Sequence, residues 1–207
     1  MKVILINGSP NKNGVTYTSL CEMAKVFEKN GIETKMVQAG GSARGCIGCK
    51  ACVKTGVCAF GDDDFVNSTG TLVANADGVV VGSPVHYAAA SGAITGFMDR
   101  LFYSHGKTFA NKPAAAVVSC RRGGASAAFD QLNKYFSISS MPIVTSQYWN
   151  QLHGNTVEDA LQDLEGLQTM RTLAENMSWL LKCINAGKEN NVPMPQREAP
   201  VRTSFIR

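Results

Sequence analysis

Residues 1–19 read MKVILINGSPNKNGVTYTS, and this stretch decides the fold of the chain. Val3 to Ile6 are a short apolar run, typical of a parallel strand that is buried on both faces. Turn residues follow, then small and hydroxylated residues, and then an apolar pattern of helical period. A strand, a polar loop and a helix N-terminus together predict an anion site, because the first N–H groups of a helix lack helical partners. An ordinary polar turn between a strand and a helix would have the same sequence pattern.

Two common nucleotide motifs are missing from this stretch. It has no Gly-Lys-Ser/Thr ending, so it is not the P-loop of a nucleoside triphosphatase, and it has no Gly-x-Gly-x-x-Gly pattern. The predicted anion site is therefore of another kind.

Composition bounds the class of protein. A chain of 207 residues with 44% hydrophobic content suits one α/β domain with a real core. No apolar run reaches the roughly 20 residues that span a bilayer, and the N-terminus lacks a signal-peptide pattern, so we expect a cytoplasmic protein without membrane contact.

The net charge of +4 suits an anionic ligand, but no basic block indicates nucleic acid. Because 7 cysteines are an odd number and the expected compartment is reducing, clustered thiols indicate metal or redox chemistry rather than disulfides.

The rest of the chain alternates strand and helix. Strands are expected at 32–37, 79–81 and 113–120, with a fifth beginning at 142–144; helices are expected at 16–30, 65–76, 92–102, 125–136 and 156–186, the last broken near Gly166. Short right-handed crossovers of this kind build an α/β fold, a doubly wound five-stranded parallel sheet with helices on both faces. We expect one domain over 1–187 and an extended arm over 188–207, either laid over a neighbouring subunit or disordered.

Three polar loops fall at the carboxyl ends of expected strands, at 9–19, 83–92 and 119–124. Ligands of such sheets bind outside the carboxyl ends of the strands. A phosphate on the first loop, with two further loops beside it, suits a mononucleotide. Its flat ring would lie between residues 84–87 and 121–124, where glycines let the backbone approach a ring edge.

These loops, taken with a run of cysteines, resemble a known family. The chain is similar to flavodoxin-like NAD(P)H-dependent FMN reductases, and more narrowly to the branch that includes iron–sulfur flavoproteins. The resemblance rests on residues 8–16, 46–58 and 82–100, and it covers Met1 to about Gly187. It implies a flavodoxin-like sheet, non-covalent FMN, a nicotinamide substrate, and homodimers or homotetramers.

The resemblance also implies the site residues, position by position. The FMN phosphate would be held by Ser9, Asn11, Thr16, Tyr17 and Thr18. The isoalloxazine ring would be flanked by Pro84, Val85, His86, Tyr87, Ser119, Arg121, Gly123 and Gly124. The chemistry belongs mainly to the flavin, so no protein base is required. Arg121 or Arg122 could stabilise the reduced flavin, and His86 either protonates a quinone product or simply lines the pocket.

Four cysteines lie within 13 residues, at Cys46, Cys49, Cys52 and Cys58. The iron–sulfur branch of the family uses this kind of run to bind a 4Fe–4S cluster, since one loop must wrap one cubane. A zinc site is an alternative, although zinc ligands more often come as two separated pairs. Thiols without metal are the other alternative.

The expected function is therefore that of an FMN-binding oxidoreductase. It would pass reducing equivalents from NAD(P)H through FMN to a quinone, a nitro compound, free flavin or a protein. The alternative is an electron carrier that relays electrons between FMN, a 4Fe–4S cluster on the four cysteines and a protein partner. A redox-sensing binding protein is a third hypothesis. The sequence leaves open the acceptor and the choice between NADH and NADPH.

Overall fold

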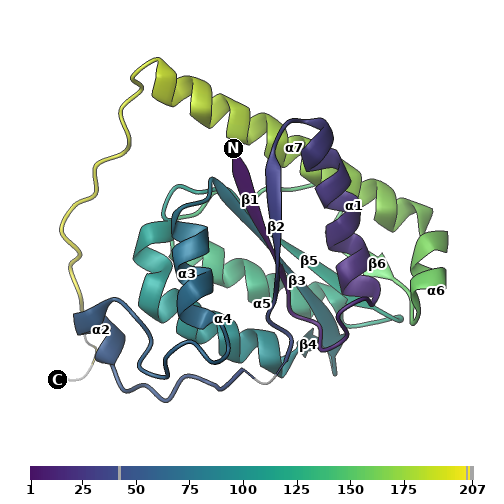
Figure 1. The fold of residues 1–207 in the computed structure, drawn as a ribbon, viewed down its shortest axis with the longest axis horizontal. Helices are drawn as coiled ribbons and strands as arrows, with labels where there is room; N and C mark the ends of the chain where they lie inside the picture. Colours follow the sequence, from purple (N-terminus) through teal and green to yellow (C-terminus); the bar gives the residue numbers. More distant parts are fainter. Residues whose placement is uncertain (42, 204, 206–207) are drawn as a thin grey trace.

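A computed structural model describes residues 1–41, 43–203 and 205, and its centre is a parallel sheet (Figure 1). The strand order is β2-β1-β3-β5-β6, which confirms the predicted doubly wound sheet of five parallel strands. The strands are β1 (Lys2–Asn7), β2 (Glu33–Gln38), β3 (Gly78–His86), β5 (Ala114–Cys120) and β6 (Gln151–His153). A two-residue strand, β4 (Ala89–Ala90), pairs antiparallel with the end of β3.

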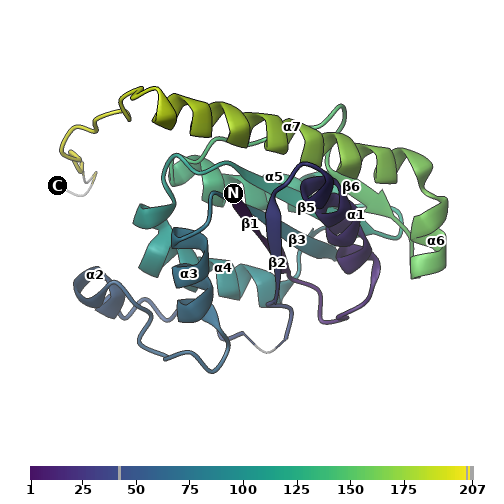
Figure 2. The ribbon, with the colours of Figure 1, turned by 45° about the horizontal axis from the view of Figure 1, so that its top comes forward.

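Helices cover both faces of the sheet (Figures 1 and 2). They are α1 (Val15–Lys29), α2 (Ala51–Thr55), α3 (Val66–Ala74), α4 (Gly92–His105), α5 (Ala125–Ile138), α6 (Val157–Gln162) and α7 (Leu164–Glu189), with a 3-10 turn at Gly106–Phe109. The long α7 lies beside α1 on one face, while α3, α4 and α5 lie on the other. Within the described residues, no helix is both long enough and apolar enough to cross a membrane.

The alternation of side chains along β1 assigns its residues to the two halves of the core. Ile4 and Ile6 pack on the face covered by α3, α4 and α5, while Val3 and Leu5 pack against α1 and α7. All four side chains are buried. The apolar run that opens the chain is therefore a central strand with helices on both sides, as expected.

The fifth strand begins later than the sequence predicted. At 142–144 the chain makes only a single parallel bridge, between Ile143 and Ala114, and the strand itself is β6. The chain rejoins the sheet at Asn150, whose Nδ2 donates to the carbonyl of Ala116 at 3.0 Å, while its own carbonyl accepts from Val118 N at 2.9 Å. A buried side-chain amide thus pairs with a backbone carbonyl of β5 directly before β6 begins.

Two predicted helix starts are confirmed. Ser91 caps α4 by accepting from Ile94 N at 3.3 Å. Thr156 and Asp159 form a capping box at α6. The break in the last helical region lies at Asp163, three residues before the predicted Gly166, because the Asp163 carboxylate caps α7 by accepting from Gly166 N at 2.9 Å.

Candidate active site

The first loop leaves β1 at Asn7, a buried polar residue that fixes its path. Asn7 Oδ1 accepts from Ser9 N at 3.1 Å, and Asn7 Nδ2 donates to Gln38 Oε1 at 2.8 Å. Gln38 Nε2 in turn donates to the carbonyl of Ser9 at 2.6 Å. The side chains that end two neighbouring strands therefore hold the backbone of the loop.

Gly40 lies directly against this loop. A Cβ atom at position 40 would lie 1.9 Å from the carbonyl oxygen of Ser9 and 2.7 Å from the carbonyl carbon of Gly8. These are backbone atoms, so no side chain could rotate away to make room. Only glycine at position 40 allows the segment after β2 to approach the loop this closely.

The N-terminus of α1 has the features of an anion site. The helix follows Gly14, which has no side chain to cap it; no side chain of the described residues caps this helix, and its first turn has no acidic residue. The N–H groups of residues 15–17 thus have no helical acceptors and carry the positive end of the helix dipole. A phosphate group is the kind of ligand that such an end binds.

The hydroxyls expected near the phosphate already make bonds within the protein. Thr16 Oγ1 and Ser119 Oγ lie 2.7 Å apart and buried, which joins the start of α1 to the end of β5. Thr18 Oγ1 donates to the carbonyl of Gly14 at 3.2 Å, and Ser9 Oγ accepts from Asn11 N at 3.1 Å. The backbone N–H groups are therefore the main free donors of the loop.

Tyr17 follows Thr16 in the first turn of α1, half-buried. A side-chain hydrogen bond with Cys21 raises the pKa of the Tyr17 phenol. The phenol therefore stays protonated at neutral pH, and its hydroxyl can act as a donor.

The second loop is a β-hairpin rather than an irregular loop. β3 continues through Pro84 and Val85 to His86 and then pairs with β4. The two residues at the tip, Tyr87 and Ala88, have φ of 52° and 76°, a conformation that side chains rarely adopt. His86 and Tyr87 are exposed, so the hairpin presents both side chains to solvent.

Two serines position this hairpin relative to the first loop. Ser91 Oγ donates to the carbonyl of Gly8 at 2.9 Å, and Ser91 N donates to Ser83 Oγ at 3.0 Å. Both serines are buried. From the sequence, Ser83 and Ser91 could be assigned to the polar loop at 83–92, whereas Asn7 and Gln38 had no predicted role. Their common signal is a polar residue at or just beyond the end of a buried strand.

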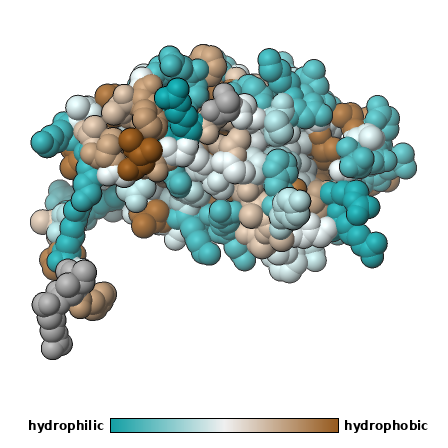
Figure 3. Space-filling view, turned by 90° about the horizontal axis from the view of Figure 1, so that it is seen from below, coloured by the Kyte–Doolittle hydropathy of each residue, from teal (hydrophilic) through white to brown (hydrophobic). Residues whose placement is uncertain are grey.

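The third loop packs on the hairpin tip through Gly124, which has φ of 89°. A Cβ atom there would lie 2.6 Å from Ala88 Cα and 2.9 Å from Val85 Cγ1. Next to it, Gly123 has open space, and Arg121 is exposed. The structure thus brings all three predicted loops to one edge of the sheet. Figure 3 views the molecule from this side, with residues of intermediate hydropathy in the central part of the face and both hydrophilic and hydrophobic ones toward its margins.

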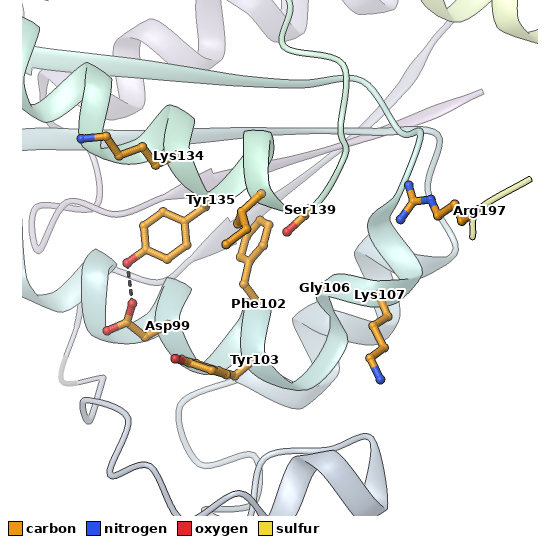
Figure 4. Close-up of a pocket in the computed structure, with 10 residues that line it drawn as sticks. Asp99, Phe102, Tyr103, Gly106, Lys107, Lys134, Tyr135, Ser139 and Arg197 are labelled. Carbon is orange, nitrogen blue, oxygen red and sulfur yellow. Dashed lines mark hydrogen bonds between the residues drawn. The ribbon is translucent and has the colours of Figure 1, made fainter. Parts of the chain in front are cut away.

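A cavity of about 530 Å³ lies elsewhere, between α4 and α5 (Figure 4). Its lining includes Phe102, Tyr103, Tyr135 and, from the C-terminal arm, Arg197. Tyr135 Oη donates to Asp99 Oδ1 at 2.5 Å, and burial together with this carboxylate raises the pKa of Tyr135. Most of the lining comes from the second halves of α4 and α5, which run back from the carboxyl edge, so the cavity is separate from the three loops.

The cysteine run lies outside the sheet, on the segment that leads to α3. Cys46 and Cys49 are exposed, Cys52 is in α2, and Cys58 is half-buried. The side chain of Asn67 in α3 forms two hydrogen bonds with the backbone of Cys58. Cys58 N donates to Asn67 Oδ1 at 2.7 Å, and Asn67 Nδ2 donates to the Cys58 carbonyl at 3.0 Å. In the part of the chain that the structure describes, no three potential ligands lie close enough together to hold a metal ion.

The chemistry of this segment nevertheless fits an iron–sulfur cluster. Four thiols on 13 residues are the ligand type that such clusters require. Arg100 lies beside Cys58. Burial lowers the pKa of its guanidinium, but hydrogen bonds to Asp64 and Cys58 raise it by more, so Arg100 stays charged. Its Nε donates to Cys58 Sγ at 3.1 Å, so the position of this sulfur is fixed from α4. Among the contacts of the described residues, Cys58 is the one cysteine of the four that side chains of the core helices hold, whereas Cys46 and Cys49 lie exposed at the surface.

The fold and these loops define a flavodoxin-like α/β protein with an anion-binding edge. Residues 1–155 match the family model for NADPH-dependent FMN reductases, and the chain belongs to this family. An iron–sulfur flavoprotein of Methanocaldococcus jannaschii is 33% identical over 193 residues, which cover 89% of this chain and 99% of that protein.

Solved structures show the same fold. RosB with a bound flavin-derived intermediate aligns with a TM-score of 0.68 at 14% identity, over all of this chain and 94% of that one. FerB, a flavoenzyme NAD(P)H:acceptor oxidoreductase of Paracoccus denitrificans, aligns with a TM-score of 0.66 at 14% identity, over 88% of this chain and 97% of that one. The predicted fold, family and FMN cofactor are confirmed: the chain is an FMN-dependent oxidoreductase.

Proposed function

We propose that this protein passes reducing equivalents from NAD(P)H through FMN to an acceptor such as a quinone, a nitro compound, free flavin or a protein. The observation that carries the proposal is the meeting of three loops around the uncapped N-terminus of α1. We also propose that it acts in the cytoplasm as a homodimer or homotetramer, with residues 188–207 as an arm.

The roles of the residues follow from their places. The N–H groups of residues 15–17 would bind the FMN phosphate, with Ser9, Asn11 and Thr18 around it. The flavin ring would lie between the hairpin at 84–88 and the loop at 121–124. Bound FMN supplies the hydride and electron chemistry, and the protein orients the ring and excludes competing reactions. Arg121 or Arg122, both exposed at the edge, could place positive charge beside the ring when it is reduced.

Rapid mixing with a nicotinamide tests the proposal directly. Under anaerobic conditions, NADPH or NADH is expected to bleach the visible absorbance of the bound flavin. The rate of this reduction should be at least as high as the rate of catalytic turnover. A protein that binds FMN but is bleached by neither nucleotide would instead be an electron carrier. Dithionite, which reduces flavin without a binding site, is the control that shows the flavin to be reducible.

A second candidate role, electron relay through a 4Fe–4S cluster, is favoured by the relative from Methanocaldococcus jannaschii, because this chain covers nearly its whole length. In this proposal Cys46, Cys49, Cys52 and Cys58 bind the cluster. Electrons would then leave the flavin toward a protein partner by way of the cysteine segment.

Iron content decides this second role. Protein purified without oxygen is expected to carry about four iron atoms per chain. The Cys49→Ser variant should lose most of this iron, whereas Cys183→Ser, which changes an exposed thiol on α7, should keep it. Zinc in place of iron, or wild-type protein without metal, would contradict the cluster and leave the FMN reductase role standing.

A further inference from the structure

Arg100 is a buried cation whose side-chain hydrogen bonds, as far as the structure describes the chain, all go to residues 44–64, the segment that contains the four cysteines. It belongs to α4, and its side chain is only 1% exposed. Its Nε donates to Cys58 Sγ at 3.1 Å, and its Nη1 forms an ion pair with Asp64 and donates to the carbonyl of Arg44 at 3.4 Å. The Phe60 ring lies 4.9 Å from the guanidinium. One side chain of the core thus holds a segment that extends from residue 44 to residue 64.

The same guanidinium has a donor to spare. Its Nη2 is buried and has no hydrogen-bond partner among the described residues, and neither has Asp64 Oδ1. Leaving a buried charged donor unpaired is unfavourable, so Nη2 has the capacity to donate to a further acceptor at this place. This unpaired Nη2 belongs to the same planar guanidinium whose Nε donates to Cys58 Sγ.

An anchoring role alone would not need this arrangement. The ion pair with Asp64 and the contact with the Arg44 carbonyl already tie the segment to α4. The N–H···S bond is an addition to them, and hydrogen bonds to ligand sulfurs are among the factors that set the potential of an iron–sulfur cluster. Groups around metal ligands also orient them and hold the metal.

We propose that Arg100 is a positioning residue for the iron–sulfur cluster, fixing Cys58 as its first ligand and raising the reduction potential of the cluster through N–H···S bonds. The inference rests on the proposed cluster. In it, Cys58 is set before the metal arrives, since both Arg100 and Asn67 hold it, and the other three cysteines close around the cluster afterwards. The free Nη2 is available to a second sulfur.

The test compares two substitutions of arginine. Arg100→Lys keeps a positive charge for Asp64 but loses Nε and the planar fork. Arg44→Lys is the matched control, because it makes the same change at a guanidinium that also lies over the Phe60 ring, at 5.5 Å, yet no contact joins its side chain to a cysteine sulfur among the described residues. The measurements are iron per chain, the rate of iron loss to a chelator, and the midpoint potential of the cluster followed by electron paramagnetic resonance.

The Arg100→Lys variant is expected to lose iron about tenfold faster than wild type and to have a more negative midpoint potential, with Arg44→Lys close to wild type. If Arg100→Lys does not fold, as judged by FMN content and circular dichroism, the pair Arg100→Gln with Asp64→Asn removes both charges together and should show the same shift. Wild-type protein without iron would overturn the cluster and this inference with it. In another outcome, the wild-type protein holds a cluster, and both single variants show the same potential and the same iron retention as each other. That result would overturn this inference and leave the cluster standing.

Discussion

The Gly40→Ala variant is expected to bind FMN about 100-fold more weakly than the wild-type protein, which corresponds to about 3 kcal/mol. The added Cβ would lie 1.9 Å from the carbonyl oxygen of Ser9, and the nearest atoms are backbone. The first loop must therefore shift, and the N–H groups at the start of α1 move with it. Because the Ser9 carbonyl also accepts from Gln38, the shift breaks the contact that holds the loop to β2.

Gly41→Ala is the matched control for this prediction. It makes the same chemical change one residue further along, where a Cβ would meet no atom of the described residues beyond its chain neighbours within 4 Å. Titration of apoprotein with FMN, followed by quenching of flavin fluorescence, gives both affinities. Circular dichroism checks that both variants are folded. If the two folded variants bind FMN with equal affinity, the first loop does not bind the phosphate.

The central sheet could be predicted because its signals are local. The apolar run at 3–6 has no polar residue to place on an exposed face, so it had to be a strand covered on both sides. The helix starts near 92 and 156 could be predicted because Ser91 and Thr156 precede helical patterns, and the cap bond of such a hydroxyl reaches only three residues ahead. The carboxyl edge followed from topology, since parallel strands bring their ends together.

The supports of the site could not be predicted, because they join residues far apart in the chain. Asn7 meets Gln38 across two strands, Thr16 meets Ser119 across the sheet, and Ser91 reaches back to Gly8. Each residue is an ordinary polar side chain in its own local sequence. The role of Asn150 was invisible for the same reason, since its partner Ala116 lies in β5.

The cysteine segment illustrates both sides of this limit. Its spacing identified four candidate ligands, since ligand runs for one cluster are compact. The spacing carried no information on which cysteine is held in place by the core helices. That cysteine is Cys58, and its contacts come from Arg100 and Asn67, which lie 42 and 9 residues away from it.

Gly124→Ala should lower the melting temperature of the apoprotein by about 9 °C, which corresponds to about 3 kcal/mol for a chain of this size. Part of this comes from strain, since alanine at φ of 89° leaves the conformations that side chains prefer. The remainder comes from overpacking, because the Cβ would lie 2.6 Å from Ala88 Cα on the hairpin tip. The hairpin must move away from the third loop, so reduction of the bound flavin by NADPH should also slow.

Gly123→Ala separates stability from flavin binding. This position has open space, so the melting temperature of the apoprotein should stay at the wild-type value. If the flavin ring fills that space, the same methyl group must weaken FMN binding, because it then meets the ring edge rather than solvent. An unchanged FMN affinity in Gly123→Ala would place the ring away from Gly123. An unchanged melting temperature in Gly124→Ala would mean that the hairpin and the third loop do not pack as described.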